Sequence, residues 1–304
     1  MFIDGHADTI SKILREKEGL YSNNAHFDIK RAIAAGIEMQ VLALFTPEKK
    51  SSDAAVSIKR QIDYFNQQLT LCKDKAFDLT ESTQLNDLGE QRIGLMLHLE
   101  GGDAIGHELS MISNLYERGV RSVGLTWNYG NAIASGIMDV GPQHGLTDFG
   151  REVIKELNRM RMIVDVAHAS HKTFYDVLEL TESPPWVSHA NVYSLCQHPR
   201  NLTDDQIKAV KDANGVVGIC FVPDFVGSDA DINSLVDHIC YISNLIGIEH
   251  VAFGSDFDGT PITVVPDVSK IPELIGILEK RQFNADEIKN ISGGNLLRLL
   301  KQVL

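Results

Sequence analysis

The sequence predicts a (β/α)₈ barrel of the TIM type, and three observations lead to this expectation. Short apolar runs recur along the 304 residues, with helix-like segments between them. Most of these runs are continuously apolar, which is typical of parallel strands buried on both faces. No G-x-G-x-x-G fingerprint follows the first run, which argues against the open sheet of a dinucleotide-binding protein. Strand and helix alternating about eight times therefore favour a closed barrel, and we expect residues 1–304 to form one domain.

The expected strands are runs rich in β-branched and other apolar residues. In chain order they are FID from Phe2, IEMQVLALF from Ile37, IGLMLHLE from Ile93, VRSVGLTW from Val120, MIVDVAH from Met162, PWVSH from Pro185, GVVGICFV from Gly215 and HVAFGSDFD from His250. Each is short enough for a single barrel strand and is followed by polar residues or a turn signal.

The expected helices have apolar residues at helical spacing and recognisable ends. They cover residues 53–74, 146–161, 202–215, 231–247 and 284–291. Thr147 and Thr203 are suitable N-caps, and Asn284 with Glu287 three residues on resembles a capping box. The polar stretch from Ile10 to His26 shows no such regularity, so we expect it to be an inserted loop over one face.

Composition narrows the class of protein. The chain is 43% hydrophobic, which allows a large core, and its net charge of −13 disfavours nucleic acid as a partner. The four cysteines form no C-x-x-C pair, so we expect free thiols rather than disulfides. No secretory signal and no apolar stretch of about 18 residues is present, so we expect a cytoplasmic protein without membrane contact.

Histidines and carboxylates follow most of the expected strands. They are His6, Asp8, His98, Glu100, Asp165, His168, His189, Asp256 and Asp258. Each alone could be an ordinary buried or capping residue, but the carboxyl ends of barrel strands open onto one face. The set would therefore converge at one mouth. Nitrogen and oxygen ligands without thiolate suit Zn²⁺ best, with Mn²⁺, Co²⁺ or Fe²⁺ as alternatives.

The number of ligand side chains indicates more than one ion. His6 and Asp8 are two residues apart on an extended segment, so both side chains point to the same side. One open catalytic zinc needs fewer ligands than this set offers. Two ions with a shared carboxylate would use five ligand side chains and would activate a water held between the ions.

The residues at these strand ends form short motifs. They are DGHAD at residues 4–8, LHLEGG at 97–102, DVAHAS at 165–170, WVSHA at 186–190, HPRN at 198–201, GSDFDG at 254–259 and GGNLLR at 293–298. In this order, and spanning nearly the whole chain, they resemble the motifs of the membrane (renal) dipeptidase family of zinc peptidases, peptidase family M19. The resemblance implies a metal-dependent hydrolase with a (β/α)₈ barrel, two Zn²⁺ ions and dipeptide substrates, often with a D-residue at the carboxyl end.

The resemblance also implies a role for individual residues. His6 and Asp8 would bind one ion, His168 and His189 the other, and Glu100 would bridge them. Arg200 matches the arginine that binds the carboxylate of the substrate, a use that suits its forked donors. Asp256 matches the acid that takes a proton from the bridging water and passes it to the leaving amine.

One position departs from the pattern of the animal enzymes. They carry a histidine after Leu-Thr in the fourth strand, where it supports the oxyanion, whereas this chain has Trp127. Indole N–H can donate a hydrogen bond but is never a base or a cation. We expect Trp127 and the adjacent Asn128 to contact substrate. His98 lies on the same strand face as Glu100, and we expect it to be a packed interior histidine.

The sequence therefore predicts a binuclear zinc dipeptidase that acts through a hydroxide between the ions. Two alternatives stay open. The same centre could hydrolyse another amide, such as an N-acyl-D-amino acid or a lactam. Trp127 leaves room for a metal-loaded binding protein with weak catalysis. Relatives are commonly dimers, so a homodimer is an open expectation.

Overall fold

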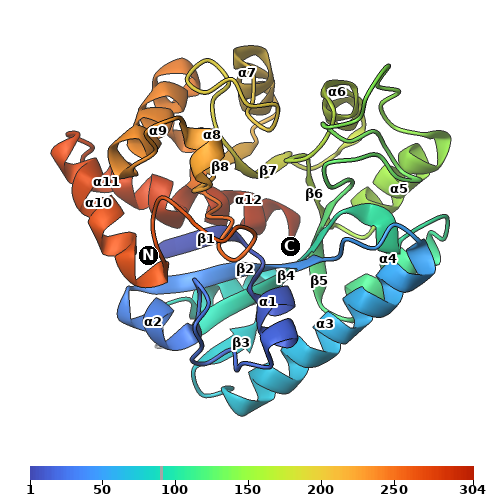
Figure 1. The fold of residues 1–304 in the computed structure, drawn as a ribbon, viewed down its shortest axis with the longest axis horizontal. Helices are drawn as coiled ribbons and strands as arrows, with labels where there is room; N and C mark the ends of the chain where they lie inside the picture. The colour runs from blue at the N-terminus through green and yellow to red at the C-terminus, as the bar shows by residue number, and fades with distance from the viewer. Residues whose placement is uncertain (90–91) are drawn as a thin grey trace.

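The computed structural model describes residues 1–89 and 92–304 and shows a closed parallel barrel with helices around it (Figure 1). The strands are β1 (Phe2–Ala7), β2 (Ile37–Phe45), β3 (Ala76–Asp78), β4 (Ile93–Glu100), β5 (Val120–Gly124), β6 (Ile163–Asp165), β7 (Trp186–Ala190), β8 (Val216–Ile219) and β9 (Val251–Phe253). Their order is β2-β1-β9-β8-β7-β6-β5-β4-β3, and β2 also pairs with β4. That pairing closes every strand except β3 into a cylinder, so the predicted (β/α)₈ barrel is confirmed.

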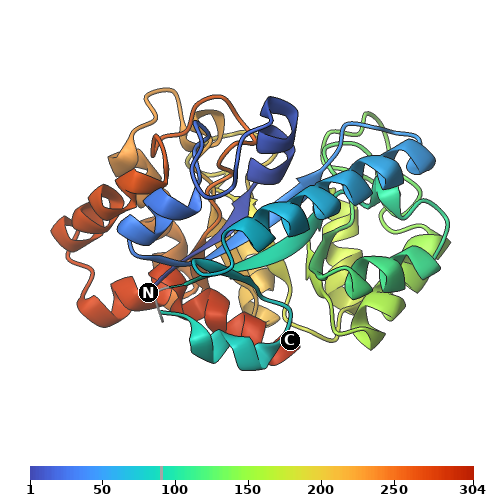
Figure 2. The same ribbon diagram turned by 90° about the horizontal axis from the view of Figure 1, so that it is seen from below.

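Helices follow most of the barrel strands and cover the cylinder from outside (Figures 1 and 2). The α-helices are α1 (Thr9–Glu16), α2 (Ile29–Ala34), α3 (Ser51–Leu71), α4 (Ser110–Glu117), α5 (Asp148–Arg159), α6 (His171–Leu180), α7 (Asp204–Asp212), α8 (Pro223–Val226), α9 (Ile232–Ile246), α10 (Ile271–Lys280), α11 (Ala285–Lys289) and α12 (Asn295–Val303). Short 3₁₀ turns span Ser82–Asp87, Gly102–Ala104, Ile248–His250 and Val268–Lys270, and a π-turn spans Asn290–Gly294.

The caps expected from the sequence form as predicted. The Thr147 hydroxyl accepts the Gly150 N–H at 2.9 Å at the start of α5. Asn284 and Glu287 form a reciprocal capping box at α11, which satisfies backbone donors that the helix itself leaves free.

Two local predictions need correction. Residues 10–26 are not a loop throughout, because Thr9–Glu16 form α1. Ile10 and Ile13 lie one turn apart and are fully buried, so this short amphipathic pattern is enough to dock a helix against the barrel. The strand β3 was not predicted, because three residues carry almost no periodic signal. It pairs with β4 where β4 begins, from Ala76 opposite Ile93, and does not contribute to the cylinder.

A buried aspartate joins β6 to β7 inside the barrel. The backbone register between these strands places Asp165 opposite Trp186. The Asp165 carboxylate accepts the Ser188 backbone N–H at 2.9 Å and the Ser188 hydroxyl at 2.7 Å. Ser188 directly precedes His189, so this contact also fixes the backbone of β7 next to a candidate metal ligand.

The same arrangement joins β1 to the end of β9. Here Asp4 is registered with Phe253, and its carboxylate accepts the Ser255 N–H at 2.8 Å and the Ser255 hydroxyl at 2.6 Å. Gln40 donates a further hydrogen bond to the same carboxylate at 2.8 Å. Ser255 directly precedes Asp256. We call these two contacts the Asp–Ser bridges, and each lies beneath a predicted site residue.

Two other expectations concern membranes and thiols. Across residues 1–89 and 92–304, no helix has the length and apolar character that crossing a membrane requires. Within the same ranges the four cysteines, Cys72, Cys196, Cys220 and Cys240, are free, as predicted.

Candidate metal centre

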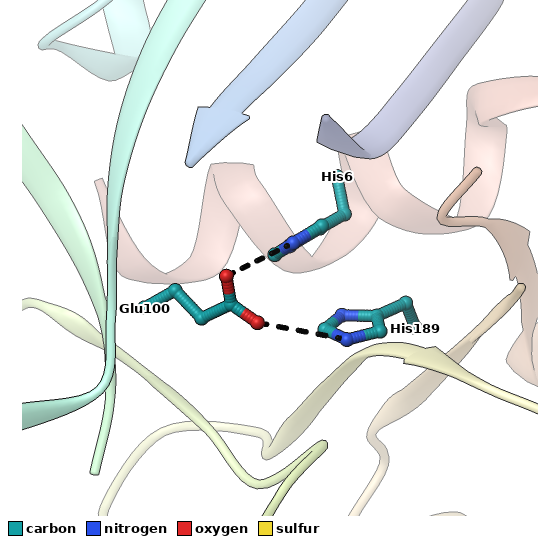
Figure 3. A group of neighbouring side chains, drawn as sticks. All are labelled: His6, Glu100 and His189. Atoms are coloured by element: carbon teal, nitrogen blue, oxygen red, sulfur yellow. Dashed lines mark ion pairs between the residues drawn. The ribbon is translucent and has the colours of Figure 1, made fainter. Parts of the chain in front are cut away.

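The five side chains predicted to bind metal lie together at the carboxyl ends of the strands. Figure 3 shows three of them, His6, Glu100 and His189, pointing toward one another. One Glu100 oxygen lies 2.9 Å from His168 Nε2 and 3.8 Å from His189 Nε2, and the other lies 3.7 Å from His6 Nε2. Asp8 Oδ2 is 3.5 Å from His6 Nε2. All five are buried, so they form one compact group at the floor of the barrel mouth.

Hydrogen bonds from behind set the tautomer of His189. The Ser188 hydroxyl uses its hydrogen to donate to Asp165, so its oxygen accepts from His189 Nδ1–H at 2.9 Å. The proton of the neutral ring is therefore on Nδ1, and the Nε2 lone pair faces the centre. Partners of this kind fix the orientation of metal-binding histidines in proteins.

His168 is oriented in the same way by a different residue. Its Nδ1 lies 2.9 Å from the Asn128 side-chain oxygen, which can only accept, so this ring also presents the Nε2 lone pair to the centre. The two Nε2 atoms of His168 and His189 are 2.9 Å apart, and a Glu100 oxygen faces both. None of these three atoms carries a hydrogen that it could donate to the other two, and a cation would stabilise this arrangement.

Lowered pKa values keep two of the three histidines neutral, the form that binds a metal. Burial, followed by the nearby Arg200 charge, lowers the pKa of His168 to about 4. Burial, followed by the charges of His6 and Arg200, lowers the pKa of His189 well below its usual range. Burial also opposes the charged form of His6, but the Glu100 and Asp8 carboxylates outweigh it and raise the pKa of His6 well above its usual range. Carboxylates that attract a proton this strongly favour any cation placed among them.

Several buried polar atoms also lack a partner, which supports a bound metal. In the part of the chain that the structure describes, both ring nitrogens of His6 and Asp8 Oδ1 are buried without a hydrogen bond. Ligand atoms fall into two groups, His6–Glu100–His189 and His6–Asp8–Asp256, each within 4.8 Å. Because orphaned buried polar atoms are costly, the residues present fit a bound divalent cation.

Asp256 lies beside this group and has an unusual backbone. Its φ of 59° is in the left-handed region, which turns the carboxylate toward the mouth after β9. Oδ1 is 4.0 Å from His6 Nε2. Burial raises its pKa well above the usual range; His6 opposes this effect, while Asp8 and Glu100 add to it. A carboxylate that holds a proton so readily can exchange one with a substrate.

Gly259 is required where the chain passes Asp256. A Cβ atom there would lie 2.1 Å from Asp256 Oδ1 and 2.6 Å from Asp8 Oδ2. Both distances are shorter than van der Waals contact, so any side chain would displace a carboxylate of the site. In the sequence, only the place of this glycine at the end of the GSDFDG motif marks it.

Arg200 is buried in the wall of the mouth and does not project freely into it. One terminal nitrogen donates to the Ala167 carbonyl, and the other donates to the His189 carbonyl at 3.1 Å and lies 3.3 Å from His168 Nε2. Its Nε is buried, and no partner for it is seen among the described residues. The guanidinium is thus held rigidly, with donor capacity left for an anion.

A cavity of about 320 Å³, the site cavity, opens above the metal-binding group and includes Arg200, Trp127 and Asn128 in its wall. The Trp127 ring stands 5.1 Å from the Phe45 ring and 6.3 Å from the His168 ring. Asn128 also orients His168, a role that no sequence pattern indicates because it depends on how two loops meet.

His98 is an interior residue one layer below the centre. Its Nδ1 lies 2.9 Å from the Ser122 hydroxyl and its Nε2 lies 3.4 Å from Asp165 Oδ2. The ring is 5.5 Å from the ring of His6 and is fully buried. This placement agrees with the interior packing expected from the sequence.

Comparison with known proteins gives a consistent family. The sequence model of the membrane dipeptidase family, peptidase family M19, matches residues 1–304. An uncharacterized protein in the pqqA 5′ region of Klebsiella pneumoniae is 36% identical over 69% of this chain and 82% of its own. Dipeptidase aclJ of Aspergillus oryzae is 40% identical over 70% of this chain, and the match spans 52% of that relative.

Solved structures show the same fold at lower identity. A metallopeptidase from Rhodobacter sphaeroides, liganded with a phosphinate mimic of the dipeptide L-Ala-D-Ala, superposes with a TM-score of 0.94 at 23% identity, covering 100% of this chain and 99% of its own. The probable dipeptidase PvdM from Pseudomonas aeruginosa gives 0.91 at 20% identity, covering 100% and 95%.

Proposed function

The chain belongs to the membrane dipeptidase family, peptidase family M19, and on this premise we propose that it is a binuclear zinc enzyme that hydrolyses dipeptides. The named activity of the Aspergillus oryzae relative and the dipeptide mimic in the Rhodobacter sphaeroides structure support a dipeptide substrate. One observation carries the proposal. His168 Nε2, His189 Nε2 and a Glu100 carboxylate oxygen face one another, although none of them has a hydrogen to donate to the others.

The residues assigned to the metals follow from their positions. His6 and Asp8 hold one ion, His168 and His189 hold the other, and Glu100 lies between the pairs with an oxygen toward each. When bound, the two ions supply Lewis-acid activation of a water and polarise the substrate carbonyl.

Asp256 moves the proton in this proposal. Its carboxylate faces the same space as His6 and Asp8, so it can accept a proton from the attacking water. It then delivers that proton to the amine that leaves when the peptide bond breaks, which avoids expulsion of an amide anion.

Arg200 binds the terminal carboxylate of the substrate and limits its length. The guanidinium is pre-positioned by two backbone carbonyls, so little side-chain entropy is lost when an anion reaches its remaining donors. A substrate with its carboxylate at Arg200 and its scissile carbonyl above Glu100 has room for few residues in a cavity of about 320 Å³.

Metal analysis combined with a substrate panel tests the proposal. We expect purified protein to bind two zinc ions per chain and to hydrolyse L,L- or L,D-dipeptides, with N-acyl-D-amino acids and lactams as comparison substrates. His189→Ala should lose zinc and activity together, whereas Arg200→Ala should keep zinc and lose activity. Bound zinc without turnover of any dipeptide would contradict the proposed function, and preferred turnover of substrates without a free amine would favour the other amides.

A further inference from the structure

A second cavity adjoins the site cavity on the side of α1 and α3. It encloses about 420 Å³ and shares the side chains of Ser11, Arg15 and Phe45 with the site cavity. Its other walls come from α1, α3 and the segment after β2, elements that lie next to one another in Figures 1 and 2. A molecule in the site cavity can therefore extend into this space without leaving the protein surface.

This second cavity is basic, in contrast to the rest of the molecule. Arg15, Lys17 and Arg60 line it, and no carboxylate of the described residues does so. The site cavity, by comparison, is lined by the carboxylates of Asp8, Glu100, Asp224, Asp256 and Asp258. In a chain with a net charge of −13, a wall with three cations and no acid is a local reversal of charge.

Two of the three cations have no acidic partner in the protein. Within residues 1–89 and 92–304, neither Lys17 nor Arg60 forms an ion pair, and Arg15 pairs with its chain neighbour Glu16 at 3.8 Å. Leu14 and Phe45 add apolar surface beside them. All three cations are exposed, so their side chains are free to turn toward a bound anion, and salt screens the attraction.

We infer that this basic cavity binds an acidic side chain on the amino-terminal residue of the substrate, so that the preferred dipeptides begin with glutamate or aspartate. This inference rests on the proposed function. Arg200 lies in the segment after β7, and the basic cavity lies beside α1, which follows β1. In the closed sheet β8 and β9 lie between β7 and β1, so Arg200 is across the mouth of the barrel from the basic cavity. A dipeptide held by its terminal carboxylate at Arg200 thus directs its first residue toward Arg15 and Arg60.

Matched substrates test the inference. We expect kcat/KM for L-Glu-D-Ala to exceed that for L-Gln-D-Ala by about tenfold or more, because the two side chains differ in charge and hardly in size. The preference should shrink as NaCl is raised from 0.05 to 0.5 M. The second-position pair L-Ala-D-Glu and L-Ala-D-Gln should show no comparable preference.

Substitutions in the cavity wall separate this inference from general charge effects. The double variant Arg15→Gln, Arg60→Gln removes both cations that would face the acidic side chain, so it should reduce the Glu/Gln ratio to near one. Lys59→Gln removes a cation from the same helix that pairs with Asp63 and does not line the cavity, so it should leave the ratio unchanged.

Three results would overturn the inference: a Glu/Gln ratio near one in the native protein, a preference confined to the second position, or an equal fall of the ratio in Lys59→Gln. In each of these cases continued hydrolysis of L-Ala-D-Ala would leave the proposed function intact. Failure of every dipeptide, L-Ala-D-Ala included, in zinc-loaded protein would instead reject the proposed function.

Discussion

Replacing Ser188 by alanine tests how the centre obtains its geometry. The substitution keeps the fold of the strand and removes one oxygen, which accepts from His189 Nδ1–H at 2.9 Å and donates to Asp165 at 2.7 Å. His189 then loses the partner that holds its proton on Nδ1. We expect the ring to spend part of its time in the other tautomer or rotated away from the metals.

The magnitude follows from the contacts that remain. Loss of a partner of this kind typically lowers metal affinity about 10- to 100-fold. Folding should suffer less, because Asp165 still accepts backbone N–H groups from Ala167 at 3.0 Å and from residue 188 at 2.9 Å. The loss of the side-chain hydrogen bonds should cost about 1–3 kcal/mol of unfolding free energy, measured without metal.

Competition with a chromophoric chelator measures the zinc affinity, and Ser122→Ala is the matched control. Ser122 is also buried, and its hydroxyl also lies 2.9 Å from a histidine Nδ1, but that histidine is His98, which is not a candidate ligand. Ser122→Ala should therefore lose similar stability and keep zinc affinity within about twofold. If both variants lose zinc affinity equally, or if neither does, the idea that Ser188 orients His189 is wrong.

Three further predictions concern other parts of the molecule. Trp127→His should raise kcat on typical dipeptides by up to about 10²-fold if the indole handicaps oxyanion stabilisation, and an unchanged kcat would show that another group already supplies this support. Gly259→Ala should weaken zinc binding at least tenfold, because its Cβ would lie 2.1 Å from Asp256 Oδ1 and 2.6 Å from Asp8 Oδ2; isothermal titration of the apoprotein measures this, and native affinity would refute it. Asp78→Asn should stabilise the fold at neutral pH, because burial, only partly offset by Arg121, raises the pKa of Asp78 to about 6 in the folded protein. A raised carboxyl pKa means that ionisation opposes folding, so the gain of about 1–2 kcal/mol at pH 7 should disappear as the pH falls through 6 toward 4. Urea unfolding of both proteins at pH 7 and pH 4, with chelator present throughout, checks the sign, and a gain that grows toward pH 4 would contradict it.

The sequence was informative where one residue type has one main explanation. Continuous apolar runs such as the one from Ile37 are compatible with few structures other than a buried parallel strand, and they predicted the barrel. The segment Thr9–Glu16 was misjudged because two buried isoleucines are a weak periodic signal among polar neighbours. A three-residue strand such as Ala76–Asp78 offers even less.

The sequence predicted which side chains form the candidate site, but not which residues orient them. His6, Glu100 and His189 stand at strand ends, so barrel topology alone brings them near one another. The pairing of Ser188 with His189 and Asp165 depends on the register between β6 and β7, which no local pattern encodes. The basic cavity likewise joins residues from α1 and α3, whose relative placement only the folded chain provides.

The two Asp–Ser bridges link the pairing of the barrel strands to the positions of the site residues, because the same contacts hold both. Ser188 and Ser255 each hold two adjoining strands in place and each directly precede a reactive side chain. If either Asp–Ser bridge breaks and the two strands separate, the metal-binding side chains next to it move apart. Bound metal ions would therefore oppose local unfolding of the barrel at both bridges. The backbone amide protons at both bridges should consequently exchange with solvent more slowly in the metal-bound protein than in the metal-free protein. This should hold although one bridge joins β6 to β7 and the other joins β1 to the end of β9.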